Sequence, residues 1–273
     1  MKSARPLIVA VATLAAAISL PLRGAPATEA AAGRALVKRY VDTIVGIELV
    51  VTLRVKMQGQ ERPPQEQRIE INGTVISPSG LTVTSLAAVD PQVAFSQPGS
   101  RVELLGADFK EVKLRLADGT EIPARFVLKD SDLDLAFMAP DTAENPTARD
   151  FNHVKLAESA EAALLENFYY VARAPKVLQR IPLVRSAEVI GIIEKPRKLY
   201  LLSDQSLGTP MFDAQGRVLG ISVQNFAGGR AAGMVVMPSA DIAEMAKQAA
   251  AAQAAPPPAP TPAPAPPADT SKQ

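Results

Sequence analysis

The sequence contains no cysteine and no tryptophan, and its 273 residues include a single histidine, His153. Without thiols, the chain has neither disulfides nor thiolate chemistry. It also lacks the ligands from which structural zinc sites are usually built. Aromatic residues make up 4% of the chain and hydrophobic residues 47%, so a core must consist mainly of Val, Ile, Leu and Ala. We therefore expect no cofactor and no bound metal.

An excess of charge of one sign is also missing. The chain has 29 Lys and Arg residues against 28 Asp and Glu residues, which gives a formal net charge of +1. Surfaces that bind nucleic acid need clustered cations to replace the counterions of the phosphates. Here the basic residues are scattered among acids, and the small cluster at 195–198 is typical of a solvated loop. The sequence argues against a nucleic-acid partner.

Long apolar runs are missing too, apart from one near the N-terminus. Lys2 and Arg5 precede the apolar residues 7–22, and the small residues Ala-Pro-Ala follow at 25–27. This order predicts a signal peptide over residues 1–27. The run is short for a membrane span of about 20 residues, so membrane attachment would require an uncleaved signal. We expect an exported protein that is periplasmic, attached to the cell envelope or secreted.

The two ends of the remaining chain have helical patterns. Residues 28–45 contain apolar side chains at helical spacing, which predicts a short lead-in helix. Ser239 is a suitable N-cap for a C-terminal helix over residues 239–255. Residues 256–273 are rich in Pro and Ala, a composition that favours an extended or disordered tail over a packed element.

Between these ends, the sequence has the patterns of strands. Residues 43–55 are rich in β-branched side chains, and apolar and polar residues alternate over 67–77. The polar segment 58–67 contains a Pro pair and predicts an exposed hairpin loop. Further strand-like runs lie at 101–105, 111–117, 122–129, 133–139, 166–174, 184–193, 198–203, 217–224 and 231–238. Many short strands at this spacing indicate an all-β sandwich or barrel fold.

Three stretches resemble segments of the HtrA/Deg-type proteases of the trypsin fold. Residues 73–89 (GTVISPSGLTVTSLAAV) are similar to a family segment that has an I-S-P-x-G turn and ends in T-N-x-H-V-V. Residues 204–221 (DQSLGTPMFDAQGRVLGI) are similar to the segment that carries G-N-S-G-G-P. Residues 117–138 resemble the segment that begins A-D-G and ends D-L-A-V-L. The resemblance covers roughly residues 46–240.

The resemblance implies an all-β fold, a trypsin-like double β-barrel with short N-terminal and C-terminal helices. It assigns the first barrel to residues 46–140 and the second to residues 156–238. The link over 141–155 has no regular period and is rich in turn-forming residues. We expect no PDZ domain after the second barrel.

Proteases of this family use a general-base histidine, an orienting aspartate and a nucleophilic serine. The resemblance aligns these residues with Ala87, Asp134 and Leu207, respectively. Alanine and leucine side chains can neither accept a proton nor attack a carbonyl carbon. The glycine of the oxyanion hole aligns with Gln205, which lacks the conformational freedom of glycine. The resemblance therefore implies a protease fold without catalytic residues.

The sequence also contains candidates for other catalytic or metal-binding arrangements. Ser206, or Ser203 near it, is the first candidate for a rearranged nucleophile. A Ser/Lys dyad also stays open, because its two members can be far apart in the sequence and meet only in the folded chain. His153 lies in the predicted link, where a structural role is favoured over that of a displaced base. A calcium loop starting at Asp130 fails because Leu135 replaces its required glycine.

Together these patterns predict an exported, catalytically inactive protein that acts as a binding or scaffolding module. Its partner would be a protein or an extended peptide, held in the cleft between the barrels or added as a strand at a sheet edge. An active hydrolase with a rearranged nucleophile and a structural protein of the cell envelope are the alternatives. The oligomeric state stays open.

Overall fold

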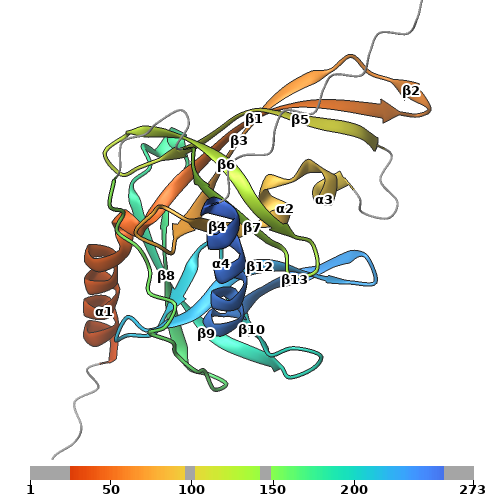
Figure 1. The fold of residues 1–273 in the computed structure, drawn as a ribbon. Coiled ribbons are helices and arrows are strands. Elements are labelled where there is room, and N and C mark those ends of the chain that lie inside the picture. The colour runs from red at the N-terminus through yellow and green to blue at the C-terminus, as the bar shows by residue number, and fades with distance from the viewer. Residues whose placement is uncertain (1–24, 96–101, 142–148, 255–273) are drawn as a thin grey trace, which may run out of the picture.

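The computed structural model describes residues 25–95, 102–141 and 149–254. Two sheets are flanked by an N-terminal helix, α1 (Ala25–Tyr40), at the left of Figure 1, and by a C-terminal helix, α4 (Ser239–Ala254), in front of the strands. Of the predicted signal peptide, only the last residues are described, as the start of α1. The predicted Pro/Ala-rich tail lies outside the described residues.

The first barrel contains six antiparallel strands in a closed order. They are β1 (Ile44–Met57), β3 (Gln65–Val75), β4 (Thr82–Ser85), β7 (Leu135–Pro140), β6 (Glu121–Asp130) and β5 (Val102–Arg115). The barrel closes because β5 also pairs with β1, and the short β2 (Gln60–Glu61) extends the sheet beside β1. Alternate side chains point inward, so β-branched and leucine residues of these strands form one buried cluster.

β1, β3 and β5 continue beyond the barrel as a three-stranded arm (Figure 1). Its apolar face buries Val51, Leu53 and Val55. The runs 101–105 and 111–117 were predicted as separate strands, and this prediction was wrong: both belong to β5. Bulges at two places in the pairing allow β5 to follow β1 along its whole length despite the break in alternation.

The second barrel is also closed and antiparallel. Its order is β10 (Leu199–Leu202), β13 (Arg230–Pro238), β12 (Val218–Ala227), β11 (Pro210–Phe212), β8 (Asn167–Arg173) and β9 (Pro182–Ile193). Apolar side chains such as Phe168, Tyr200 and Met211 fill its interior. The predicted double β-barrel with two terminal helices is thereby confirmed.

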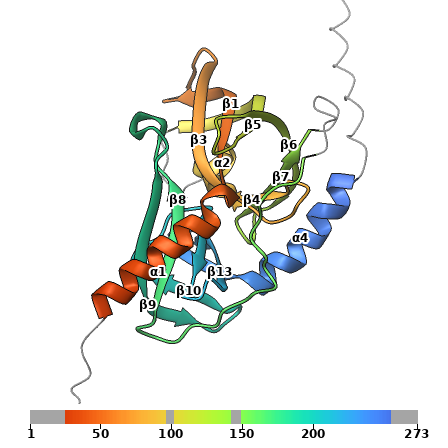
Figure 2. The ribbon, with the colours of Figure 1, turned by 90° about the vertical axis from the view of Figure 1, so that its left-hand side faces the viewer.

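A third apolar cluster lies between the barrels and joins them to both helices. It contains Leu36 and Tyr40 of α1, strand residues of both barrels, and Ile242 of α4. The Tyr40 ring stacks on Phe212 with centroids 4.1 Å apart, and its hydroxyl donates to the Gly216 carbonyl at 2.7 Å. Figure 2 shows α1 lying against β8 and β9, and α4 on the other flank. We call this contact zone between the barrels the seam.

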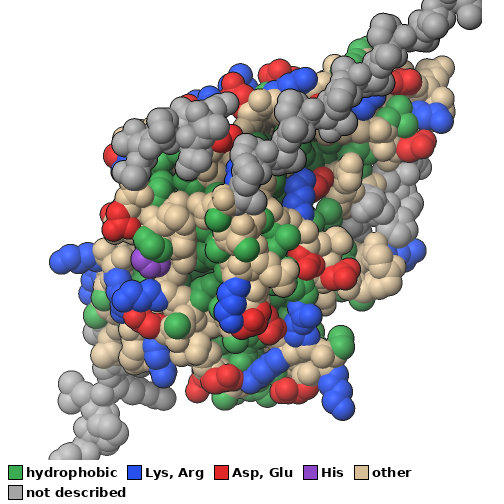
Figure 3. All heavy atoms as spheres, viewed as in Figure 1, with side chains coloured by type: hydrophobic (Ala, Val, Ile, Leu, Met, Phe, Trp, Pro, Cys, Tyr) green, Lys and Arg blue, Asp and Glu red, His purple; other side chains and the backbone are tan. Residues whose placement is uncertain are grey.

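Four short helical turns complete the described fold: η1 (Val41–Thr43), α2 (Leu86–Val89), α3 (Pro91–Phe95) and η2 (Lys176–Leu178). In the described ranges, no helix combines the length and apolarity needed to cross a bilayer. On the face drawn in Figure 3, Lys and Arg side chains alternate with Asp and Glu. This mixture agrees with the formal net charge of +1.

Candidate functional site

Asp134 lies in the tight connection between β6 and β7, at the seam. Its backbone φ is 55°, a left-handed value that aspartate tolerates better than most residues. The residue is 1% exposed. Its carboxylate accepts hydrogen bonds from Ser85 Oγ and, at 2.7 Å each, from the backbone N–H groups of Ala87 and Gln224. Burial raises the pKa of Asp134, and these three hydrogen bonds oppose the increase.

Ala87 lies in α2, a single helical turn that follows β4 directly. The turn is fixed by the Leu86 N–H, which donates to the Asp134 carbonyl at 2.9 Å, and by the Asp90 N–H, which donates to the Leu86 carbonyl at 2.8 Å. The positions aligned with the general base and the orienting carboxylate are thus in direct contact through the Ala87 N–H. The Ala87 methyl group has no titratable atom, so this contact cannot transfer a proton.

Leu207 lies in the turn between β10 and β11, which packs against β4. The neighbouring Gly208 has a φ of 75°, and a Cβ added there would lie 2.2 Å from Thr84 Oγ1. The Gly208 carbonyl accepts a hydrogen bond from Thr74 Oγ1 at 2.9 Å. Thr84 is followed by Ser85, so the positions aligned with the nucleophile and with the triad aspartate both rest on β4.

The position aligned with the oxyanion glycine is occupied by Gln205, whose side chain packs against β13. Gln205 Nε2 donates to the Met234 carbonyl at 2.8 Å, and Gln205 Oε1 is buried without a hydrogen-bond partner among the described residues. Ser222 Oγ is buried and unpaired in the same way. Such an atom costs about 1–3 kcal/mol of stability. The Gln205 side chain is therefore fixed against β13 where the family has a glycine, and its backbone lacks the conformational freedom with which glycine turns N–H donors toward an oxyanion.

The alternative serines have no free base beside them in the described structure. Ser203 is exposed, and its Oγ accepts the Glu188 N–H at 2.9 Å. Ser206 lines a cavity of about 250 Å³ at the seam. The charged residues that line this cavity are Glu70, Arg173, Arg180 and Arg185. Neither lysine nor histidine is among them, and Glu70 is bound to Arg180 at 2.7 Å.

The remaining sequence candidates serve local structure. His153 Nδ1 lies 3.1 Å from the Phe151 carbonyl, and the neighbouring Val154 N–H donates to the Val75 carbonyl at the end of β3. Asp130 Oδ1 accepts the N–H groups of Asp132 and Leu133, at 3.0 and 2.9 Å. Within the described ranges, no group of three or more His, Asp or Glu side chains is arranged to hold a metal ion.

A second cavity, of about 370 Å³, lies beside β12 and β13. Its wall includes Leu133 of the first barrel, the β9–β10 loop with Lys195 and Arg197, and residues 223–227 of β12. β12 pairs with β13 on one side and with β11 only up to Ile221 on the other. The outer edge of 223–227 therefore pairs with no strand in the described part of the chain. We call the cavity itself the β12 cavity.

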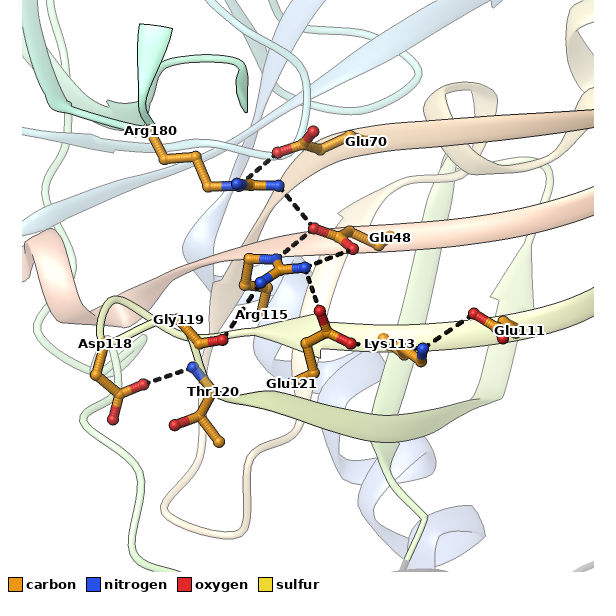
Figure 4. Close-up of polar contacts among 10 residues, drawn as sticks. All are labelled: Glu48, Glu70, Glu111, Lys113, Arg115, Asp118, Gly119, Thr120, Glu121 and Arg180. Carbon is orange, nitrogen blue, oxygen red and sulfur yellow. Dashed lines mark hydrogen bonds and ion pairs between the residues drawn. The ribbon is translucent and has the colours of Figure 1, made fainter. Parts of the chain in front are cut away.

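Part of the seam is held by an ionic network (Figure 4). Arg180, which precedes β9 in the second barrel, binds Glu48 of β1 at 2.8 Å and Glu70 of β3 at 2.7 Å. Arg115 of β5 binds the same Glu48 and also Glu121 of β6. The hydrogen bond from Arg115 holds the pKa of Glu48 below its ordinary value. Glu48 thereby links strands of the first barrel to a loop of the second.

The motif matches identified four positions of the site, but not the groups that contact them. These positions are Ala87, Asp134, Leu207 and Gln205. Gln224 binds Asp134 through its backbone N–H, which no side-chain pattern can reveal. Phe226, which lines the β12 cavity, lies beyond the run 217–224 that was predicted as a strand. A buried polar residue in an apolar strand, such as Ser85, is the one signal that could have been used.

Comparisons with known proteins agree with this architecture. The model of the trypsin-like peptidase domain matches residues 71–221. No curated protein matches the chain. Solved structures that match include the protease domain of MamO from Magnetospirillum magneticum in its apo form, with 18% identity and a TM-score of 0.47. That alignment covers 76% of this chain and 97% of the MamO chain.

Proposed function

Because the chain belongs to the trypsin-like peptidase domain family, we propose that it is an exported, catalytically inactive member that holds an extended protein segment without cleaving it. Its motifs make an HtrA-type origin the best match within the family. The observation that carries the proposal is the hydrogen bond from the Ala87 N–H to Asp134 at 2.7 Å. This bond puts a methyl group where the family needs a base beside its carboxylate.

The neighbouring groups support the absence of catalysis. Leu207 offers no nucleophilic atom, and Gln205 replaces the glycine whose backbone conformation the oxyanion hole requires. The two side chains that could replace the nucleophile, Ser203 and Ser206, have no lysine or histidine in the contacts described above. A general base contributes about 10²–10⁴-fold in rate, so its loss alone is severe.

The β12 cavity supports the binding role. An extended peptide could pair with the outer edge of β12 beyond Gln224, whose own N–H is bound to Asp134, and place alternate side chains in the cavity, as in other cases of strand addition. Main-chain hydrogen bonds of this kind contribute about 0.5–1.5 kcal/mol each. They depend only on the backbone of the guest, so the arrangement favours unfolded segments of many sequences.

A binding assay that also reports cleavage tests the proposal. Fluorescein-labelled casein, an unfolded protein, is titrated with the full chain, and its fluorescence anisotropy and its size on a gel are followed together. We expect the anisotropy to rise while the casein stays intact. Cleaved casein, or a serine labelled by a fluorophosphonate probe, would refute inactivity. Unchanged anisotropy would refute the binding role.

A pair of variants locates the binding site. Phe226→Glu introduces a charge into the β12 cavity, and we expect it to weaken casein binding by at least about tenfold, equivalent to about 1.4 kcal/mol. Ile190→Glu is the matched control, because Ile190 is 57% exposed on β9 and does not line this cavity. Equal effects of the two substitutions would move the site away from β12.

Export rests on the charged, apolar and small-residue segments of residues 1–27. We expect the mature protein to lack about these residues and to fractionate outside the cytoplasm. Intact-mass measurement of the protein from its native host, together with cell fractionation, checks both points. A full-length cytoplasmic protein would contradict export and leave the binding proposal standing.

A further inference from the structure

A groove opens between β5 and β6 in the first barrel. The two strands pair only at Lys113–Arg115 and Glu121–Pro123. Beyond these residues β5 stays with β1 and β6 stays with β7, so the facing edges separate. A cavity of about 500 Å³ lies in the gap. It shares no lining residue with the β12 cavity, so this inference does not depend on the proposed function.

The groove has an aromatic and apolar lining. The rings of Phe109 and Phe126 face each other from the two strands, with centroids 5.1 Å apart and planes at 62°. Both rings are partly exposed, and Val112 and Pro123 continue the apolar surface. Lys129, which is not part of the lining, lies over both rings and holds the pair in place. Grooves lined by aromatic rings are the surfaces that bind polyproline II segments.

The last described residues of α4 lie beside this groove, and the chain's own proline-rich segment follows them in the sequence. Arg125 lines the groove, and its Nη2 donates to the Gln253 carbonyl at 3.0 Å. The Gln253 side chain is in turn hydrogen-bonded to Ser79, through both its oxygen and its nitrogen. The end of α4 is therefore fixed beside the groove. The sequence PPPAPTP follows at residues 256–262.

We propose that residues 256–262 occupy the groove between β5 and β6 as a polyproline II segment. Along β5, the groove extends from Lys113 to Phe109, a length of about 14 Å at the rise of a strand. About five residues of polyproline II, at about 3.1 Å each, match this length. Proline has no N–H with which to complete a strand edge, so contacts with Phe109 and Phe126 hold the segment.

The short connection makes weak contacts sufficient. A segment tethered directly beside its site has an effective concentration on the order of millimolar. An intrinsic dissociation constant of about 100 μM would then leave the groove filled in about nine of ten molecules. The docked segment would cover apolar surface on an otherwise open part of the first barrel.

Hydrogen exchange measured by mass spectrometry tests the proposal on the full chain. In the near variant, Pro256, Pro257, Pro258 and Pro260 are replaced by Ser; in the far variant, Pro264, Pro266 and Pro267 are replaced by Ser. Neither variant changes a residue within the described ranges. We expect amides in 109–113 and 124–127 to exchange about tenfold slower in the wild type and the far variant than in the near variant.

A groove-side variant provides an independent check. Phe126→Leu keeps an apolar side chain but removes one ring, and we expect it to exchange like the near variant while keeping the wild-type melting temperature to within a few degrees. Equal exchange in the wild type and the near variant would overturn the proposal. Protection that rises with protein concentration would also overturn it, because it would assign the docked segment to a second copy of the chain.

Discussion

At the scale of single residues, Asp134 is a buried carboxylate whose hydrogen-bond partners come from both barrels. It accepts hydrogen bonds from Ser85 and Ala87 of the first barrel and from Gln224 of the second. A buried carboxylate is costly unless donors compensate it. Here the donors are main-chain and hydroxyl groups that the fold itself supplies. The residue therefore has a structural reason to stay, whatever happens to the base and the nucleophile.

Replacing Asp134 by Asn tests this structural role. The amide group of asparagine would point a donor toward Gln224 N–H or toward Ala87 N–H, which are donors themselves. We expect the free energy of unfolding to fall by about 1–3 kcal/mol, measured by urea denaturation. The exposed Asp132→Asn, two residues away, is the control and should change it by less than about 0.5 kcal/mol. Equal effects of the two substitutions would show that the hydrogen bonds of Asp134 do not stabilise the fold.

Two substitutions can introduce a base and a nucleophile at the aligned positions. Ala87→His with Leu207→Ser returns a base and a nucleophile, but Gln205 still stands where the oxyanion hole needs the conformational freedom of glycine. We expect no peptide hydrolysis from this double variant. Adding Gln205→Gly should produce activity of at least about 10²-fold over the double variant, the effect of one oxyanion-hole donor. The rate of cleavage of a fluorogenic peptide decides, and robust activity in the double variant would refute the role given to Gln205.

At the scale of elements, the turn between β10 and β11 depends on Gly208. A Cβ at this position would lie 2.2 Å from Thr84 Oγ1 and 2.6 Å from the Asn72 carbonyl oxygen. The φ of 75° would strain any other residue as well. The first barrel and the turn can therefore pack this closely only because residue 208 has a hydrogen atom in place of a side chain.

Gly208→Ala separates packing from backbone strain when compared with Gly119→Ala. Gly119 has a similar φ of 84°, but a Cβ there would meet nothing within 4 Å. We expect Gly119→Ala to cost about 1–2 kcal/mol of unfolding free energy from strain alone, and Gly208→Ala to cost at least about 2 kcal/mol more. Chemical denaturation measures both. Similar costs would show that the seam tolerates the added methyl group.

The elements also show which parts of the fold are accessible from sequence. Alternation and β-branched residues marked β1 and β3, because each has one buried face. The same rule divided β5 in two, since its pairing with β1 contains bulges that interrupt the alternation. Closure of two barrels followed from the family motifs, since periodicity alone allowed a sandwich. At the site, side-chain motifs identified Ala87 and Asp134 but not the backbone donor of Gln224.

At the scale of the whole molecule, the two barrels are joined by charge as well as by apolar contacts. Arg180 of the second barrel binds Glu48, which also binds Arg115 within the first barrel (Figure 4). The Glu48 side chain is 26% exposed. The pKa of Glu48 is lowered, first by the Arg115 hydrogen bond. The unfolded chain therefore takes up this proton at a higher pH than the folded chain does.

This difference predicts how stability depends on pH. The contribution of Glu48 is fully present above its ordinary pKa of 4.5 and is lost as the pH falls through the lower pKa of the folded state. We expect Glu48→Gln to cost about 1–2 kcal/mol at pH 7 and much less at pH 3. Urea denaturation at the two pH values measures this, with the exposed Glu66→Gln as control. A loss that does not depend on pH would contradict the linkage.

Asn72 forms a polar contact across the seam. Its side-chain amide donates to the Arg173 carbonyl at 3.1 Å, and its side-chain oxygen accepts the Arg173 N–H at 3.0 Å. Asn72 also begins the tripeptide Asn-Gly-Thr, which fits the acceptor pattern for N-linked glycans. A glycan would have to replace a hydrogen of the amide that contacts Arg173. A glycan would leave Nδ2 one hydrogen for the Arg173 carbonyl but would add a bulky group at the seam, so in a eukaryotic secretory host we expect glycosylation at Asn72 to compete with closure of the two barrels.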